Sequence, residues 1–129
     1  MKKVWVNGCF DVLHRGHVEL LQYAKSQGDQ LVVGIDFDER VKAAKGETRP
    51  FNTFKDRKFL LESLECVDKV VGFGTDFELR NCIEREEPYC MIVGSDWEGK
   101  NVIGREHVKM VHYFSRIGDY STTKILEKK

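Results

Sequence analysis

The sequence lacks a net charge, a long apolar run and any closely spaced pair of cysteines. Its 129 residues hold 21 Lys and Arg against 21 Asp and Glu, so the formal net charge is zero. Non-specific nucleic-acid binding needs a broad surplus of basic side chains, which this balance excludes. No stretch approaches the roughly 20 apolar residues that span a bilayer, and no apolar signal region follows Lys3. We therefore expect a cytoplasmic protein that binds neither nucleic acid nor a membrane.

The four cysteines are too widely spaced for a disulfide framework or a zinc ribbon. We expect Cys9, Cys66, Cys82 and Cys90 to be free thiols, most of them buried. A chain of 129 residues is long enough to bury a core of its own, and no repeat, low-complexity tract or linker divides it. The sequence therefore predicts one domain over residues 1–129.

Short apolar segments alternate with helical ones along the chain. The predicted strands cover residues 4–6, 31–35, 69–73, 90–93 and 108–113. The predicted helices cover residues 18–28, 38–43, 53–64, 78–86 and 121–127. Several of the strands are apolar throughout, which is typical of strands that are buried on both faces. The alternation predicts an α/β protein with a parallel sheet of about five strands and helices on both faces.

Ligands of such sheets bind beyond the carboxyl ends of the strands. The polar segments that follow the predicted strands here are residues 7–17, Asp36, residues 94–100 and residues 116–123. We expect these segments to converge on one crevice, which makes them the candidates for a functional site.

The segment after the first predicted strand has the most informative spacing. His14 and His17 stand three residues apart where a helix begins, with Gly8 and Gly16 nearby. A helix N-terminus attracts phosphate through its unpaired N–H groups and partial positive charge, and imidazoles beside it donate to phosphate oxygens. The same spacing also fits two capping histidines without a ligand. A zinc pair is a third alternative, although no further ligand is obvious.

The motif around these histidines narrows the choice. Residues 8–17 resemble the G-x-F-D-x-x-H-x-G-H signature of the cytidylyltransferase-like nucleotidyltransferases. The resemblance covers nearly the whole chain and implies a small Rossmann-like three-layer α/β/α domain. It also implies that His14 and His17 bind the triphosphate and stabilise the transition state of nucleotidyl transfer. The loop residues expected to contact the nucleotide are Gly8, Cys9, Phe10 and Gly16.

Later parts of the chain match further motifs of the family. Residues 121–123 resemble its second signature, S-T-[TS] preceded by an arginine, and a helix start of this kind makes another phosphate cradle. The resemblance therefore implies nucleotide contacts by Ser121, Thr122 and Thr123. It also implies that basic side chains at three matching positions contact phosphates. The predicted catalytic set is His14, His17, Lys45, Arg57 and Arg116.

Two subfamilies compete for the substrate assignment. Residues 7–11 and 45–73 are similar to the heptose-1-phosphate adenylyltransferase domain, whereas residues 94–100 and Arg116 resemble glycerol-3-phosphate cytidylyltransferase. Residues 94–100 and Arg116 are the motifs expected near the nucleotide base, so they favour CTP and a reaction of the glycerol-3-phosphate type. The alternative is ATP with a heptose phosphate. Further nucleotide contacts are expected at Gly94, Asp96 and Trp97. The candidates for acceptor binding are Asp11, Asp36 and Arg49.

The resemblance implies direct attack by a phosphate oxygen of a phosphorylated alcohol or sugar on the α-phosphorus, with pyrophosphate leaving. Such a reaction needs positioning and charge stabilisation and no protein nucleophile. Mg²⁺ is expected with the triphosphate and without a direct protein ligand, and Asp11 either holds that ion through water or orders its loop. We further expect a homodimer, as in relatives. A non-catalytic nucleotide-binding regulator is the alternative from another class.

Overall fold

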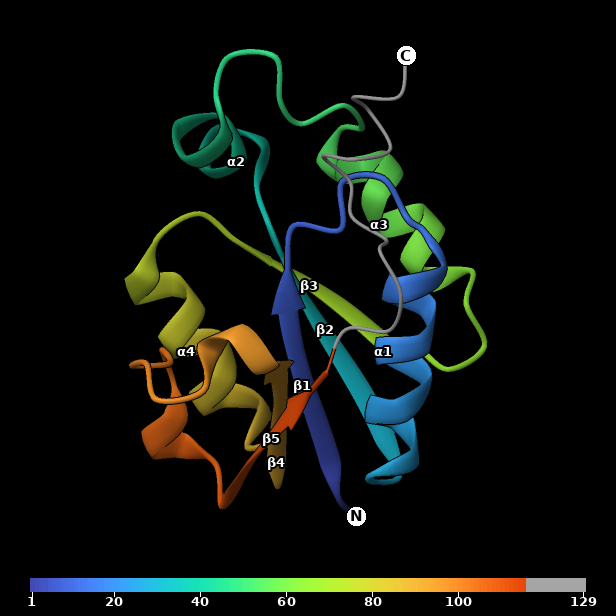
Figure 1. The fold of residues 1–129 in the computed structure, drawn as a ribbon, viewed down its shortest axis with the longest axis vertical. Helices are drawn as coiled ribbons and strands as arrows, with labels where there is room; N and C mark the ends of the chain where they lie inside the picture. The colour runs from blue at the N-terminus through green and yellow to red at the C-terminus, as the bar shows by residue number, and fades with distance from the viewer. Residues whose placement is uncertain (116–129) are drawn as a thin grey trace.

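A computed structural model describes residues 1–115 of the chain. Figure 1 shows a sheet between helices, with five parallel strands in the order β3-β2-β1-β4-β5. The strands are β1 (Lys3–Gly8), β2 (Gln30–Asp36), β3 (Lys69–Phe73), β4 (Cys90–Gly94) and β5 (Met110–Phe114). The expected parallel sheet of about five strands is confirmed.

Helices cover both faces of the sheet, so the three-layer, Rossmann-like arrangement is also confirmed. The helices are α1 (Arg15–Ser26), α2 (Asp38–Lys45), α3 (Phe54–Glu62) and α4 (Asp76–Glu86), with 3-10 turns η1 (Ser95–Trp97) and η2 (Arg105–His107). In Figure 1, α1 and α3 lie on one face and α4 on the other. None of the helices within residues 1–115 is long and apolar enough to cross a membrane. The helix predicted at 121–127 lies outside the described residues.

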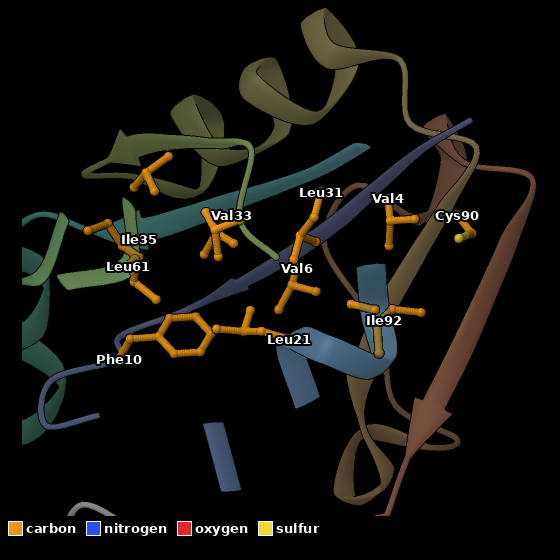
Figure 2. Close-up of a cluster of buried hydrophobic side chains, with 13 residues drawn as sticks. Val4, Val6, Phe10, Leu21, Leu31, Val33, Ile35, Leu61, Cys90 and Ile92 are labelled. Atoms are coloured by element: carbon orange, nitrogen blue, oxygen red, sulfur yellow. The ribbon is translucent and has the colours of Figure 1, made fainter. Parts of the chain in front are cut away.

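Two hydrophobic cores flank the sheet because successive side chains of a strand point to opposite faces. In β1, Val4 and Val6 belong to the core under α1 and α3, and Trp5 belongs to the core under α4. Figure 2 shows the first of these cores, to which α1 contributes Leu21, β1 contributes Val6 and β4 contributes Ile92. A strand that supplies both cores must be apolar at every position, which explains the uninterrupted apolar runs of the sequence. All four cysteines are free thiols, and Cys82 and Cys90 are buried.

The strand order places a switch point between β1 and β4. The chain builds β1, β2 and β3 outward in one direction and then returns to add β4 on the other side of β1. The loop after β1 leads to α1 on one face of the sheet, while the chain after β4 continues into η1. The connections therefore diverge at this point, which is where open α/β sheets bind ligands.

Candidate active site

The start of α1 is built from two mutually capping histidines. His14 is the N-cap residue, and its Nδ1 accepts the backbone N–H of Gly16 at 3.1 Å. Nδ1 of His17 accepts the backbone N–H of His14 at 3.3 Å, and the two imidazole rings stack with their centroids 3.8 Å apart. This arrangement is a capping box, with histidine in place of the usual Glu or Gln at the third helical position.

The capping bonds fix the tautomer of both imidazoles. An Nδ1 that accepts a hydrogen bond carries no proton, so each neutral ring has its proton on Nε2. His14 and His17 therefore hold the helix start with Nδ1, and each neutral ring carries its N–H donor on Nε2. The capping role and the phosphate-binding role, which the sequence left as alternatives, are compatible in this geometry.

Phe10 packs against the histidine pair. Its ring meets the His17 ring edge-on, with centroids 5.1 Å apart. The Phe10 backbone has φ of 48°, in the left-handed region that non-glycine residues rarely adopt. A Cβ atom on Gly8 would lie 3.1 Å from the Phe10 ring, which is tighter than an ordinary contact. The loop thus combines a strained phenylalanine with a glycine that leaves room for its ring.

Asp11 ties this loop to the segment before α3. Its buried carboxylate accepts hydrogen bonds from Nε of Arg49 at 2.7 Å, from the N–H of Phe51 at 2.8 Å and from the N–H of Asn52 at 2.9 Å. Burial alone would raise the pKa of the Asp11 carboxyl, but the Asn52 and Phe51 amides and the Arg49 guanidinium outweigh it and lower the pKa. A carboxylate so occupied by protein donors does not fit a water-bridged Mg²⁺ ligand. Asp11 orders the loop instead.

Acid should remove the stabilisation that Asp11 provides. Because the folded-state pKa lies below that of the unfolded chain, about 3.9, the contribution is complete above that pH and is lost as the pH falls through the lower folded value. Asp11→Asn should lower the unfolding free energy in urea by about 3 kcal/mol at neutral pH, and by less near pH 3. Asp56→Asn, which changes an exposed carboxylate of α3, is the control. A difference independent of pH would contradict an ionic role for Asp11.

Arg57, predicted to contact phosphate, is instead fully buried and bonded to protein. Its Nε donates to the carbonyl of Asn52 at 3.0 Å, its Nη1 to the carbonyl of Cys9 at 3.0 Å, and its Nη2 to Oδ1 of Asp38 at 2.7 Å. Three different segments meet at this one guanidinium. The geometry therefore makes Arg57 a positioning residue for the loop after β1.

Charged side chains of both signs surround the carboxyl ends of β1 and β2. Lys45, the exposed last residue of α2, acts on both Cys9 and Asp36 together with Arg57. Burial nevertheless dominates at Asp36 and raises the pKa of its carboxyl, against the opposing effects of Arg40, Arg57 and Lys45. Burial likewise raises the pKa of the Cys9 thiol. Of the predicted basic residues within the described part of the chain, Lys45 is exposed and Arg57 is buried.

A pocket of about 490 Å³ opens at the carboxyl ends of the strands. Asp36, Gly94 and Trp97, which the sequence assigned to different substrates, line this pocket together with Gly8. Its remaining lining residues are Asn7, Arg40, Phe73, Leu79, Val93, Asn101, Val102 and Ile103. The pocket therefore has largely apolar walls with a few polar side chains, as small-molecule sites do.

Some predicted site residues lie away from the pocket or outside the described part of the chain. Asp96 is exposed, with its Oδ1 2.6 Å from where a Cβ of Gly94 would stand, and it does not line the pocket. Arg116 and residues 121–123 lie outside the described part of the chain. Conversely, Asn7 lies in the predicted segment 7–17 but had no role assigned to it, and Arg40 was not predicted. Asn7 is the polar residue at the end of an apolar strand, a signal that was available, whereas Arg40 looks like an ordinary helix charge.

The fold and the site together define the class of protein. A parallel α/β sheet, a histidine-capped helix start after β1 and a pocket at the switch point are the features of a Rossmann-like nucleotide-binding domain. The family model described as cytidylyltransferase-like matches residues 5–128, and the chain belongs to this family of nucleotidyltransferases.

Curated relatives and solved structures agree with this assignment. The chain is 46% identical over 127 residues to the bifunctional protein HldE of Helicobacter pylori strain J99, and 46% identical over 125 residues to HldE of Campylobacter fetus. These matches cover 98% and 97% of this chain but only 27% of each relative. Among solved structures, the lipopolysaccharide core biosynthesis protein from Thermoplasma volcanium is 25% identical in sequence to this chain. The two structures superpose with a TM-score of 0.71, and the match covers 94% of this chain and 99% of that one.

Proposed function

We propose that this chain transfers AMP from ATP to a sugar phosphate of the heptose 1-phosphate type and releases pyrophosphate. The observation that carries the proposal is the capped and stacked histidine pair at the start of α1, which places two imidazoles at a helix terminus that attracts phosphate. Membership of the cytidylyltransferase-like family supports nucleotidyl transfer as the class of reaction.

The choice of ATP and a heptose phosphate depends on the relatives. The sequence favours CTP through residues 94–100 and Arg116, but the similarity to HldE proteins extends over nearly the whole chain and favours the adenylyltransferase alternative. The structure shows how two segments that matter for this choice are placed. Residues 49–52, within the segment that resembles the heptose enzymes, are bonded directly to Asp11 in the histidine loop. By contrast, the side chain of Trp97 is 48% exposed.

The arrangement suits an in-line displacement. Such a transfer requires the attacking and leaving oxygens to lie on opposite sides of the phosphorus. In this proposal the triphosphate lies on the α1 terminus, and the pocket, whose lining does not include the two histidines, holds other parts of the substrates. A bond forms between an acceptor phosphate oxygen and the α-phosphorus, and the bond to the bridging oxygen breaks, so that pyrophosphate leaves with the electron pair. His14, His17 and Lys45 stabilise the charge, and Asp36 accepts hydrogen bonds from sugar hydroxyls.

Mg²⁺ accompanies the triphosphate in this proposal. Among residues 1–115 there is no group of three His, Cys, Asp or Glu side chains that gather as metal ligands. The role of the ion is to reduce the charge on the triphosphate when it binds. The side chains and backbone amides of the protein make the other contributions to binding and charge stabilisation.

A substrate panel tests the proposal. We expect pyrophosphate release from ATP with a heptose 1-phosphate to exceed release from CTP with glycerol 3-phosphate by at least about 100-fold in kcat/KM, since a site that hydrogen-bonds its substrate strongly rejects an analogue that leaves those groups unpaired. A preference for CTP with glycerol 3-phosphate would contradict the proposal and restore the other subfamily. If no pair releases pyrophosphate although nucleotide binds, the chain is a nucleotide-binding regulator.

A further inference from the structure

Arg49 has a buried guanidinium nitrogen that lacks a hydrogen-bond acceptor. Its Nε is paired with Oδ2 of Asp11 at 2.7 Å, and the side chain is only 12% exposed. Its Nη2 is covered by protein and finds no partner within the described part of the chain. Leaving a charged donor buried and unpaired is costly, and native proteins retain such a group mostly where water, an ion or a ligand completes it.

The loop that carries Arg49 lies against the histidine loop. The backbone amides of Phe51 and Asn52 both donate to the Asp11 carboxylate, and Nδ2 of Asn52 donates to the Asp11 carbonyl at 2.8 Å. Asp11 is three residues before the N-cap His14. The Arg49 guanidinium therefore stands next to the segment that leads into the α1 terminus, with its orientation fixed through Nε.

The chemistry of the site favours an anion as the acceptor of Nη2. Oδ2 of Asp11 already accepts two donors and Oδ1 accepts one, so the carboxylate that orients the guanidinium is occupied. A guanidinium presents its remaining N–H groups in a rigid plane that matches the oxygens of phosphate. The nearby helix start attracts the same kind of group.

We propose that Nη2 of Arg49 binds a substrate phosphate oxygen, so that Arg49 is a phosphate-binding residue held in position by Asp11. This deepens the proposed function and rests on it for the identity of the substrates. The phosphate belongs either to the sugar phosphate or to the nucleotide, and the two sources share the chemistry that Nη2 recognises.

The first experiment measures binding of inorganic phosphate by thermal unfolding and needs no enzymatic activity. Arg49→Lys keeps a cation beside Asp11, but a single ammonium does not reproduce the planar fork. We expect phosphate to raise the melting temperature of the wild type and of the control Arg105→Lys, an exposed arginine of η2. Arg49→Lys should bind phosphate at least about tenfold more weakly. Wild-type affinity in Arg49→Lys would overturn the proposal.

The variant Asp11→Asn distinguishes two causes of weaker phosphate binding: a loosened loop around Arg49 and the loss of the contact by Nη2. It keeps the Arg49 guanidinium but weakens the carboxylate contact that holds it in position. If Arg49→Lys melts well below the wild type, an affinity for phosphate that falls further in Arg49→Lys than in Asp11→Asn supports the proposal. An equal fall in both variants overturns it, because the arginine then acts only through the loop.

The second experiment identifies the source of the phosphate. In the pyrophosphate-release assay, a KM for the sugar phosphate that rises at least about tenfold in Arg49→Lys, with the KM for ATP unchanged, assigns the contact to the acceptor. The reverse pattern assigns it to the nucleotide, and two unchanged KM values overturn the proposal. If the wild type turns over neither substrate pair, the proposed function has failed, while the inorganic-phosphate titration still decides the role of Arg49.

Discussion

Replacing His17 with alanine should lower turnover by at least about 100-fold while the protein remains folded. The loss follows from the removal of one preorganised donor to the charge that develops during transfer. Nδ1 of His17 accepts the backbone N–H of His14, so the helix cap fixes the orientation of the ring. The measurement is kcat for pyrophosphate release, together with the circular dichroism spectrum and the melting temperature.

The capping bond makes a matched control possible. His17→Ala also removes the acceptor for the His14 amide, which should cost about 1 kcal/mol of stability. Glutamine is a normal residue at this position of a capping box, so His17→Gln should recover much of that stability. Turnover that stays low in His17→Gln places the loss in the imidazole donor. Wild-type turnover in either folded variant would show that His17 serves only as a cap.

The sheet was predictable because its determinants are local. Each of the five predicted strands corresponds to an observed one, since a strand that feeds two cores is apolar without interruption. The bounds were less certain. The predicted strand at 108–113 is observed at Met110–Phe114, because residues 105–107 form η2 and the chain turns into the strand only afterwards. Strand order is a tertiary property and was open in the sequence.

The site was predictable where its geometry is local or follows from the topology. His14 and His17 are one helical turn apart, so their spacing already placed them together at a helix start. Asp36, Gly94 and Trp97 come from segments far apart in sequence, yet the rule that parallel strands end at one edge predicted their convergence.

The sequence could not predict the buried hydrogen bonds of the two arginines in the site. Arg49 contacts Asp11 across 38 residues, and Arg57 contacts the Cys9 carbonyl across 48. A basic residue in a helix is usually solvated, and nothing local shows that one will be fully buried with three acceptors. The family resemblance implies a phosphate contact for Arg57, whereas in the structure its Nε, Nη1 and Nη2 all donate to acceptors within the protein.

Arg57→Met should therefore be among the most destabilising single substitutions in the chain. Methionine fills much of the space but leaves the carbonyls of Cys9 and Asn52 without donors and Asp38 without its cation. Breaking a buried charged network from one side costs about 3–5 kcal/mol, a large part of the roughly 5–15 kcal/mol that stabilises a domain. Urea unfolding measures the change in free energy.

Two further variants separate positioning from direct phosphate binding by Arg57. Arg57→Lys keeps the charge but not the three-way fork, so we expect most of the destabilisation to remain. Asp38→Asn removes only the partly exposed ionic partner and should cost about 1 kcal/mol or less. A folded Arg57→Lys with wild-type stability and a raised KM for ATP would contradict the positioning role and return Arg57 to the phosphate. Stability and nucleotide affinity falling together would establish that Arg57 acts through the backbone of the loop after β1.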